Sequence, residues 1–206
     1  MRLDWIASCL VVILFATCAI AADQEQQKQA AENKAQVLEQ KAAQSSSPAP
    51  APGAEAITQS EVQAVDPAGV APLDDAITCL ARSIYWEAKG KDSVDMEAVA
   101  NVVMNRLGHG GFPDTVCGVV KQGSESKSCQ FSWWCDGRPD SVQEEVPYAL
   151  AKEIARKALN KQLPDRTGGA LYFHDRTVRP DWARRYTKTV DIGLFRFYKP
   201  RGGSAR

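Results

Sequence analysis

A single glutamate, Glu87, stands among large apolar side chains in the stretch RSIYWEAKG at residues 82–90. A carboxyl that packs against Trp86 and Tyr85 loses hydration, and this loss penalises its charged form and keeps it protonated near neutral pH. A protonated carboxyl at the edge of a groove can give its proton to a leaving oxygen, such as that of a glycosidic bond. The alternative is an ordinary surface glutamate that pairs with Lys91, worth roughly 0.2–0.5 kcal/mol.

Other familiar catalytic patterns are missing from the sequence, which has no serine–histidine pattern, no phosphate-binding loop and no HExxH motif. Its two histidines, His109 and His174, are too few and too far apart to indicate a metal site. His174 ends a strand-like stretch, where it either points into a cleft or, as we favour, makes structural hydrogen bonds. We therefore expect no metal and no cofactor.

The cysteines indicate disulfide bonds. Two of the six, Cys9 and Cys18, lie in an apolar N-terminal segment, which leaves Cys79, Cys117, Cys129 and Cys135. An even number in an exported protein predicts two disulfides. A four-cysteine zinc site is the weaker alternative, because its ligand pairs stand closer together than any pair here. Sequence alone does not choose among the three pairings; we favour Cys79 with Cys117 and Cys129 with Cys135.

The N-terminal residues 1–21 have the features of a signal peptide: Arg2, an apolar run and the small-residue site Ala19-Ile20-Ala21. The apolar run is short for a membrane span, so export with cleavage is favoured over a retained anchor. We expect a periplasmic or cell-envelope protein that contacts the membrane only if this segment is uncleaved. Lipidation is a minor alternative, because Thr17 precedes the cysteine.

Residues 22–72 are rich in Ala, Gln and Pro and contain few large apolar side chains. Such a composition buries too little apolar surface to offset the entropy of ordering, so we expect a disordered tether. Residues 24–44 favour helix by propensity, but Val37 and Leu38 are too few to dock such a helix on a domain.

The pattern becomes globular at Leu73 and continues to residue 200, followed by a flexible tail at 201–206. Apolar spacing predicts a helix that ends at Gly90 with Glu87 just outside its buried stripe, and a second helix that ends at Gly108. A helical turn around Val119, a cysteine-pinned loop at 122–140 and a third helix from Pro147, with Leu150, Ile154 and Ala158 facing inward, follow. Strand-like stretches at 170–174 and 190–198 complete an α+β domain.

Charge is unevenly distributed although the formal net charge is zero. Residues 152–206 contain fourteen Lys/Arg against five Asp/Glu, whereas residues 22–72 contain three against seven. A basic face suits an anionic polymer, and the alternative is an ordinary solvated surface. Nucleic acid is not an expected partner, because export is predicted and recognition motifs are missing.

Several runs resemble the SleB family of cell wall hydrolases, named for the spore cortex-lytic enzymes, and in particular its exported Gram-negative forms. These runs, in chain order, are CLARSIYWEAKG, MEAVANVVMNR, FPDTVCGVV, CQFSWWCDG and GALYFHDRTVRPDWARRYTKTVDIG. The resemblance covers residues 73–199. It implies a small lysozyme-like domain in which several helices flank a short antiparallel sheet around a groove.

The resemblance implies that Glu87 is the catalytic general acid and that the substrate and partner is peptidoglycan. It implies cleavage of glycan strands by lytic transglycosylation, in which a 1,6-anhydro ring forms and one carboxyl suffices. The residues that it implies in the sugar groove are Tyr85, Gln130, Phe131, Ser132 and His174. A hydrolytic muramidase would need a second carboxylate, for which Asp114, Asp136 and Asp175 are the candidates.

The chain departs from the family pattern at Phe195, where a histidine is common, and at Phe173, where a tyrosine is frequent. The departure at Phe195 keeps open a second hypothesis, a peptidoglycan-binding envelope protein with weak or no catalysis. A purely structural envelope protein is a third. Because an unrestrained wall-cleaving enzyme would damage its own cell, we also expect control by a regulatory envelope partner or by the tether.

Overall fold

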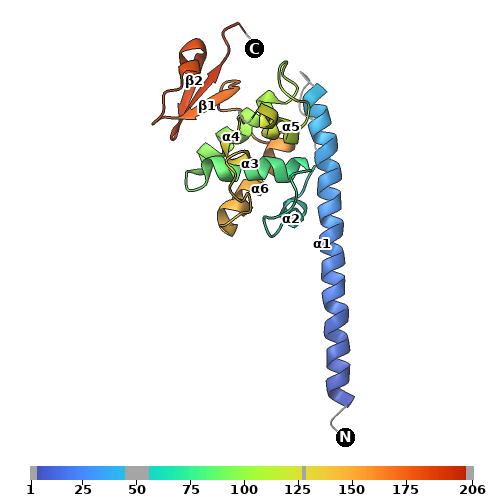
Figure 1. Ribbon diagram of the computed structural model, residues 1–206. Coiled ribbons are helices and arrows are strands. Elements are labelled where there is room, and N and C mark those ends of the chain that lie inside the picture. The colour runs from blue at the N-terminus through green and yellow to red at the C-terminus, as the bar shows by residue number, and fades with distance from the viewer. Residues whose placement is uncertain (1–3, 45–55, 127–128, 203–206) are drawn as a thin grey trace.

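The computed structural model describes residues 4–44, 56–126 and 129–202. Helices cluster into one body; the C-terminal part of the long N-terminal helix runs along its side, and a small sheet lies on the opposite side (Figure 1). The α-helices are α1 (Asp4–Gln44), α2 (Gln59–Ala64), α3 (Ala76–Ala88), α4 (Ser93–Arg106), α5 (Val116–Lys121) and α6 (Glu145–Leu159). The 3-10 turns are η1 (Ser124–Ser126), η2 (Ser132–Trp134) and η3 (Asp181–Arg185), and the strands are β1 (Tyr172–Asp175), β2 (Thr187–Ile192) and β3 (Phe195–Lys199). The α+β class predicted from the sequence is confirmed.

Helix α3 is the centre of the helical body and packs against α4, α5 and α6. Asp75 caps its N-terminus by accepting a hydrogen bond from the Thr78 amide (2.8 Å). Every residue from Ala76 to Tyr85 is buried, so the helix is enclosed on all sides along this length and not along a single stripe as expected. Only its last turn, which carries Glu87, reaches the surface.

The sheet is antiparallel with strand order β1-β3-β2. Strand β1 pairs with β3 so that Asp175 lies opposite Phe195. The stretch expected as one strand at 190–198 is instead a hairpin between β2 and β3, because Gly193 turns the chain with a φ of 47°. A Cβ atom at this position would collide with the Asp95 carboxylate, which accepts a hydrogen bond from the Leu194 amide (3.2 Å).

The expected disordered tether is wrong for the parts of residues 22–72 that the structure describes. Ala31, Ala35 and Leu38, spaced by four and three residues along α1, are buried against the domain. Two alanines let the helix approach closely, so one leucine is enough to dock it. Lys34 also bonds to Glu61 of α2 (2.7 Å). Residues 45–55 of the expected tether lie outside the described residues.

The segment between α2 and α3 is fastened to the body by Asp66. Its carboxylate is buried and accepts hydrogen bonds from Arg82 of α3 (Nε 3.0 Å, Nη2 2.8 Å) and from the Tyr148 hydroxyl of α6 (2.6 Å). The folded unit therefore begins well before Leu73.

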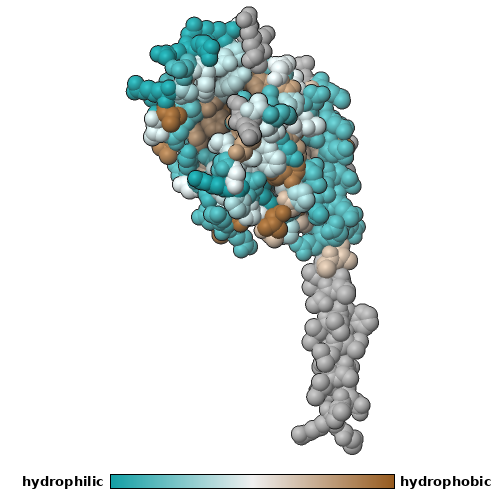
Figure 2. Space-filling model, in the orientation of Figure 1, coloured by the Kyte–Doolittle hydropathy of each residue, from teal (hydrophilic) through white to brown (hydrophobic). Residues whose placement is uncertain are grey.

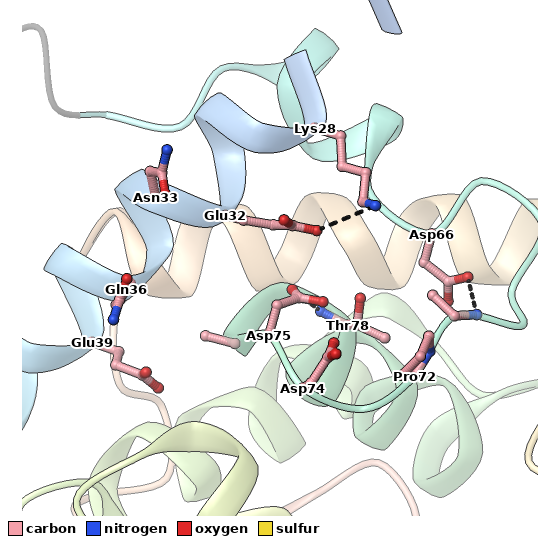
Figure 3. Close-up of a pocket in the computed structure, with 12 residues that line it drawn as sticks. Lys28, Glu32, Asn33, Gln36, Glu39, Asp66, Pro72, Asp74, Asp75 and Thr78 are labelled. Atoms are coloured by element: carbon pink, nitrogen blue, oxygen red, sulfur yellow. Dashed lines mark hydrogen bonds and ion pairs between the residues drawn. The ribbon is translucent and has the colours of Figure 1, made fainter. Parts of the chain in front are cut away.

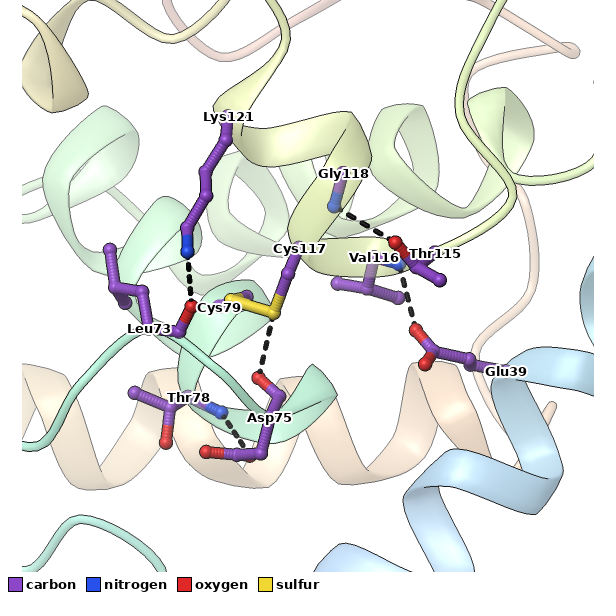
Figure 4. Close-up of a disulfide and its surroundings, with 10 residues drawn as sticks. All are labelled: Glu39, Leu73, Asp75, Thr78, Cys79, Thr115, Val116, Cys117, Gly118 and Lys121. Carbon is purple, nitrogen blue, oxygen red and sulfur yellow. Dashed lines mark hydrogen bonds between the residues drawn. A yellow bond between two sulfur atoms is a disulfide. The ribbon is translucent and has the colours of Figure 1, made fainter. Parts of the chain in front are cut away.

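Two disulfides join Cys79 to Cys117 and Cys129 to Cys135, the pairing that we favoured from the sequence. The first ties α3 to the start of α5 (Figure 4). At the same place the Glu39 carboxylate of α1 accepts a hydrogen bond from the Val116 amide (2.7 Å). Helix α1 thus reaches an otherwise unpaired amide at the N-terminus of α5.

The predicted third helix begins two residues earlier than Pro147, at Glu145. Ile154 and Ala158 face the core as expected, but the inward orientation predicted for Leu150 is wrong, since 41% of this residue is exposed. Among the described residues, no helix combines the length and the apolar character needed to cross a membrane.

Candidate active site

A cleft of about 660 Å³ lies where the end of α3 meets the sheet. Its walls come from α3, the turn after it, the end of α4, the Cys129–Cys135 loop, β1, η3 and β3. The lining residues are Glu87, Lys91, Arg106, Cys129, Gln130, Ser132, Tyr172, Phe173, His174, Asp175, Val178, Trp182, Tyr186 and Phe195. Segments up to about 100 residues apart in sequence therefore converge on Glu87.

Glu87 is half-buried in this cleft. Burial raises its pKa to about 7, although the positive charges of Lys91 and Arg106 act in the opposite direction. Its place in the last turn of α3 adds to the increase, because the negative end of the helix dipole disfavours a carboxylate there. Near neutral pH a substantial fraction of Glu87 is thus protonated and can donate a proton within the cleft.

Aromatic side chains form one wall of the cleft. Tyr172 of β1 stacks on Tyr186 with ring centroids 4.7 Å apart and planes 14° apart. Trp182 of η3 lies against both rings, at 5.8 Å and 5.7 Å. Such flat, amphipathic faces are suited to contacts with a sugar ring. Trp182 and Tyr186, four residues apart in an aromatic-rich run, were a usable sequence signal that we did not assign to the site.

Arg106 forms part of the cleft at the end of α4, although only 2% of the residue is exposed. Its Nε donates to the Leu171 carbonyl (2.7 Å), which attaches α4 to the start of β1. Its Nη1 is buried and has no hydrogen-bond partner among the described residues. Burial lowers the pKa of Arg106 to about 10, so it remains cationic at neutral pH. Sequence reasoning missed this residue although it ends the quoted run MEAVANVVMNR.

The surface-glutamate alternative predicted an ion pair between Lys91 and Glu87, and the described residues do not form this pair. Among the described residues its ion-pair partner is Asp175 of β1 (3.4 Å), and its ammonium lies 3.8 Å from the centroid of the Phe195 ring. Asp175 also accepts hydrogen bonds from the Thr177 amide (2.9 Å) and hydroxyl (2.8 Å). The bonds from Thr177 and Lys91 hold the pKa of Asp175 below its usual range.

The residues predicted for the sugar groove divide into two sets. Gln130, Ser132 and His174 line the cleft with Glu87. Tyr85 and Phe131 do not: both are fully buried. The Tyr85 hydroxyl accepts hydrogen bonds from the amides of residues 143 and 144 (3.1 and 3.2 Å), and Phe131 packs in the core. The expectation that these two rings face a substrate is therefore corrected, because their aromatic area is used in the core.

His174 has both ring nitrogens engaged. Nδ1 lies 2.7 Å from the Asp175 carbonyl, to which it donates, and Nε2 lies 3.0 Å from the Tyr198 hydroxyl. The structural hydrogen-bonding role that we favoured fits this arrangement, and the ring also forms part of the cleft wall. Of the three candidates for a second carboxylate, Asp175 lines the cleft, whereas Asp114 and Asp136 are not among its lining residues.

A second cavity, of about 560 Å³, lies between α1 and the start of α3 (Figure 3). Carboxylates dominate its lining, and burial raises the pKa of Glu32, Glu39 and Asp75. No aromatic side chain is among the described residues that line it, and these residues offer no flat face for a sugar. The cleft around Glu87 is therefore the better candidate for chemistry on a glycan.

Curated proteins similar to this chain are spore cortex-lytic enzymes. The chain is 32% identical over 132 residues to that of Halalkalibacterium halodurans, covering 63% of this chain and 36% of the relative. It is 34% identical over 124 residues to that of Oceanobacillus iheyensis, covering 60% of this chain and 41% of the relative. The chain thus spans less than half the length of these relatives.

Among solved structures, the catalytic domain of Bacillus cereus SleB matches with 29% identity and a TM-score of 0.49, over 60% of this chain and 89% of that one. The catalytic domain of the germination-specific lytic transglycosylase SleB from Bacillus anthracis matches with 28% identity and a TM-score of 0.48, over 60% and 93%. The family model described as cell wall hydrolase matches residues 90–198. This match begins three residues after Glu87 and spans more than half of the sequence, so the chain belongs to the cell wall hydrolase family.

Proposed function

We propose that this protein cleaves the glycan strands of peptidoglycan, with Glu87 as the general acid. The observation that carries the proposal is a half-buried carboxyl of raised pKa in a cleft with an aromatic wall. Membership of the cell wall hydrolase family supports peptidoglycan as the substrate, as do relatives named spore cortex-lytic enzymes. Gln130 and Ser132 are the proposed polar contacts to the sugar, and the His174 ring, whose nitrogens are already hydrogen-bonded, is proposed to form the wall beside it.

Lytic transglycosylation is the reaction that needs the fewest catalytic groups in the cleft, because one carboxyl suffices. Glu87 gives its proton to the glycosidic oxygen as the bond from that oxygen to C1 of muramic acid breaks. The ionised Glu87 then takes the proton of the C6 hydroxyl of the same sugar, while the C6 oxygen bonds to C1. The proton returns to Glu87, and no water is consumed. The positive charges of Lys91 and Arg106 favour the carboxylate between these steps.

Hydrolysis is the second candidate, and Asp175 is the observation that favours it. This carboxylate lines the same cleft and is ionised at neutral pH because its pKa is lowered. It could therefore activate a water or stabilise a cationic sugar. Its oxygens already accept bonds from Thr177 and Lys91, which makes it the weaker choice.

Digestion of purified peptidoglycan by the full chain tests the proposal, with products identified by mass spectrometry. We expect anhydromuramic ends from the parent protein and none from Glu87→Gln. Glu97→Gln serves as the matched control, since Glu97 lies on α4 outside the cleft, in an ion pair with Arg166 (3.5 Å). Reducing ends in place of anhydro ends would establish hydrolysis and direct attention to Asp175. Equal product from Glu87→Gln and the control would refute the assignment of Glu87.

Binding without cleavage is the outcome that the departure at Phe195 keeps open. In that case the parent and Glu87→Gln would both bind sacculi and release nothing, and Phe195→His would be the variant to examine for restored cleavage. We also propose that residues 1–21 direct export to the cell envelope. N-terminal sequencing of the protein recovered from the envelope fraction tests this, because a start at Ala22 is the expected result.

A further inference from the structure

A separate pocket of about 490 Å³ adjoins the active-site cleft. It is lined by His174, Arg179, Pro180, Asp181, Ala183, Arg184, Arg196 and Tyr198. His174 belongs to the walls of both the cleft and the pocket. Between these two spaces lies η3, with Trp182 on the cleft side and Asp181 and Ala183 on the pocket side. The His174 ring is held in this position by hydrogen bonds with the Asp175 carbonyl and the Tyr198 hydroxyl.

Positive charge dominates the pocket, which has three arginines and one aspartate in its lining. Arg179 is exposed and has no hydrogen bond or ion pair within the described ranges. Arg196 lies only at the limit of an ion pair with Asp191 (4.0 Å). The pair of Arg184 and Asp181 is short (2.6 Å), but its side chains are 82% and 88% exposed, so solvent screens it strongly.

The guanidinium groups of this pocket therefore keep donors available. A guanidinium presents its N–H groups as a planar fork that matches the two oxygens of a carboxylate. The surroundings reinforce the attraction, since residues 176–201 contain eight Lys/Arg and two Asp/Glu. Figure 2 shows hydrophilic side chains gathered over this end of the molecule, where Figure 1 places the sheet.

We propose that this pocket is a second binding site, which takes the carboxylates of the peptide stems of peptidoglycan. The inference rests on the proposed function, because the proposed function places a glycan strand in the adjoining cleft. Stems branch from the muramic acid residues of such a strand and carry free carboxylates. A stem that leaves the cleft past His174 and Trp182 enters the pocket directly, so the strand is held by its sugar rings on one side and its charged substituent on the other.

Binding to two preparations of peptidoglycan tests this site. One preparation is intact, and in the other the free carboxyl groups are converted to amides, which keeps the stems but removes their charge. All proteins carry Glu87→Gln so that the material is not digested. We expect the Glu87→Gln chain to bind the intact material about tenfold more tightly, and to lose this preference with added salt. Adding Arg179→Gln and Arg196→Gln should abolish the preference.

The matched control adds Arg138→Gln and Arg166→Gln, which changes the net charge equally at exposed arginines outside both spaces. This control should keep the preference for intact material. Arg179→Gln alone provides a variant at a side chain with no partner to lose, and it should reduce the preference while leaving thermal unfolding unchanged. An undiminished preference in both pocket variants, or an equal loss in the control, would overturn the site. Failure of every protein to bind either material would overturn the proposed function as well.

Discussion

Replacement of Asp66 by Asn should destabilise the whole domain, although Asp66 lies in a segment whose composition predicts disorder. Its carboxylate accepts five hydrogen bonds, each from an N–H or O–H group. Oδ1 accepts from the amides of Val70 and Ala71 (both 2.8 Å), and Oδ2 accepts from Arg82 and Tyr148. An asparagine has one oxygen and one NH2 group, so in either orientation its NH2 faces a donor.

The magnitude follows from burial. The side chains of Asp66 and Arg82 are 1% and 2% exposed, so the substitution leaves a cation inside the protein without its counter-charge. Breaking such a buried pair costs about 3–5 kcal/mol, a large part of the roughly 5–15 kcal/mol that stabilises a typical domain. Asparagine is the informative replacement because Asp66 has a positive φ of 44°, which Asn tolerates as well as Asp does.

Urea unfolding followed by circular dichroism and tryptophan fluorescence measures this effect. With a slope of about 1–3 kcal/mol per molar urea, the midpoint should fall on the order of 2 M. The control is Asp181→Asn, which removes an exposed aspartate–arginine pair and should change the unfolding free energy by less than about 1 kcal/mol. Equal midpoints for the two variants would refute the claim that the segment before Leu73 is part of the folded unit.

The pH dependence of the unfolding free energy provides a second test with the same variant. Burial alone would raise the pKa of Asp66, but hydrogen bonds from Tyr148, Ala71 and Arg82 outweigh it and hold the pKa below its ordinary value. A carboxyl with a lowered native pKa contributes stability above the ordinary pKa of about 4, and that contribution disappears as the pH falls through the native value. The difference in unfolding free energy between parent and Asp66→Asn should therefore shrink below about pH 4.

Two further predictions concern Glu87 and the N-terminal helix. Burial raises the pKa of Glu87 to about 7, so cleavage should be near maximal below pH 6 and fall about tenfold per unit above pH 7. Lys91→Met removes a charge that lowers this pKa and should move the decline in activity to higher pH. An unchanged pH profile would assign the decline to another titrating group. Leu38→Ala should cost about 2–4 kcal/mol in urea unfolding if α1 is docked, whereas Val37→Ala at its 43% exposed neighbour should cost far less.

Local signals in the sequence were sufficient to locate α3 and α4, although they did not predict that α3 is enclosed on all sides. An aspartate cap and the turn at Gly90 bound α3, and a raised pKa for Glu87 followed from its apolar neighbours alone. The composition of residues 22–72 gave a wrong prediction of disorder, because the docking of a helix depends on the positions of its apolar residues and not on their average number. Ala31, Ala35 and Leu38 share one face of α1, which a mean over the segment conceals.

The site was less predictable because its walls come from distant parts of the chain. Tyr85 adjoins the Glu87 motif in sequence, yet it points into the core, since successive residues of a helix project in directions about 100° apart. Arg106 and Trp182 reach the cleft because α4 ends there and η3 begins there. Adjacency in a motif therefore pointed to Glu87 as the candidate acid but not to the residues around it in the cleft, which depend on the packing of α4 and the sheet against α3.

The contacts of Phe195 bear on whether this chain can still act as an enzyme. The resemblance implies a histidine at this position, so phenylalanine removes a polar group from the cleft. Lys91, however, places its ammonium 3.8 Å from the centre of the Phe195 ring and pairs with Asp175 directly opposite in the sheet. Lys91 thus places a positive charge at this wall, and this charge acts on Glu87 by lowering its pKa. Because proton donation needs only Glu87 and a bound glycan, the loss of the histidine does not by itself remove the proposed chemistry.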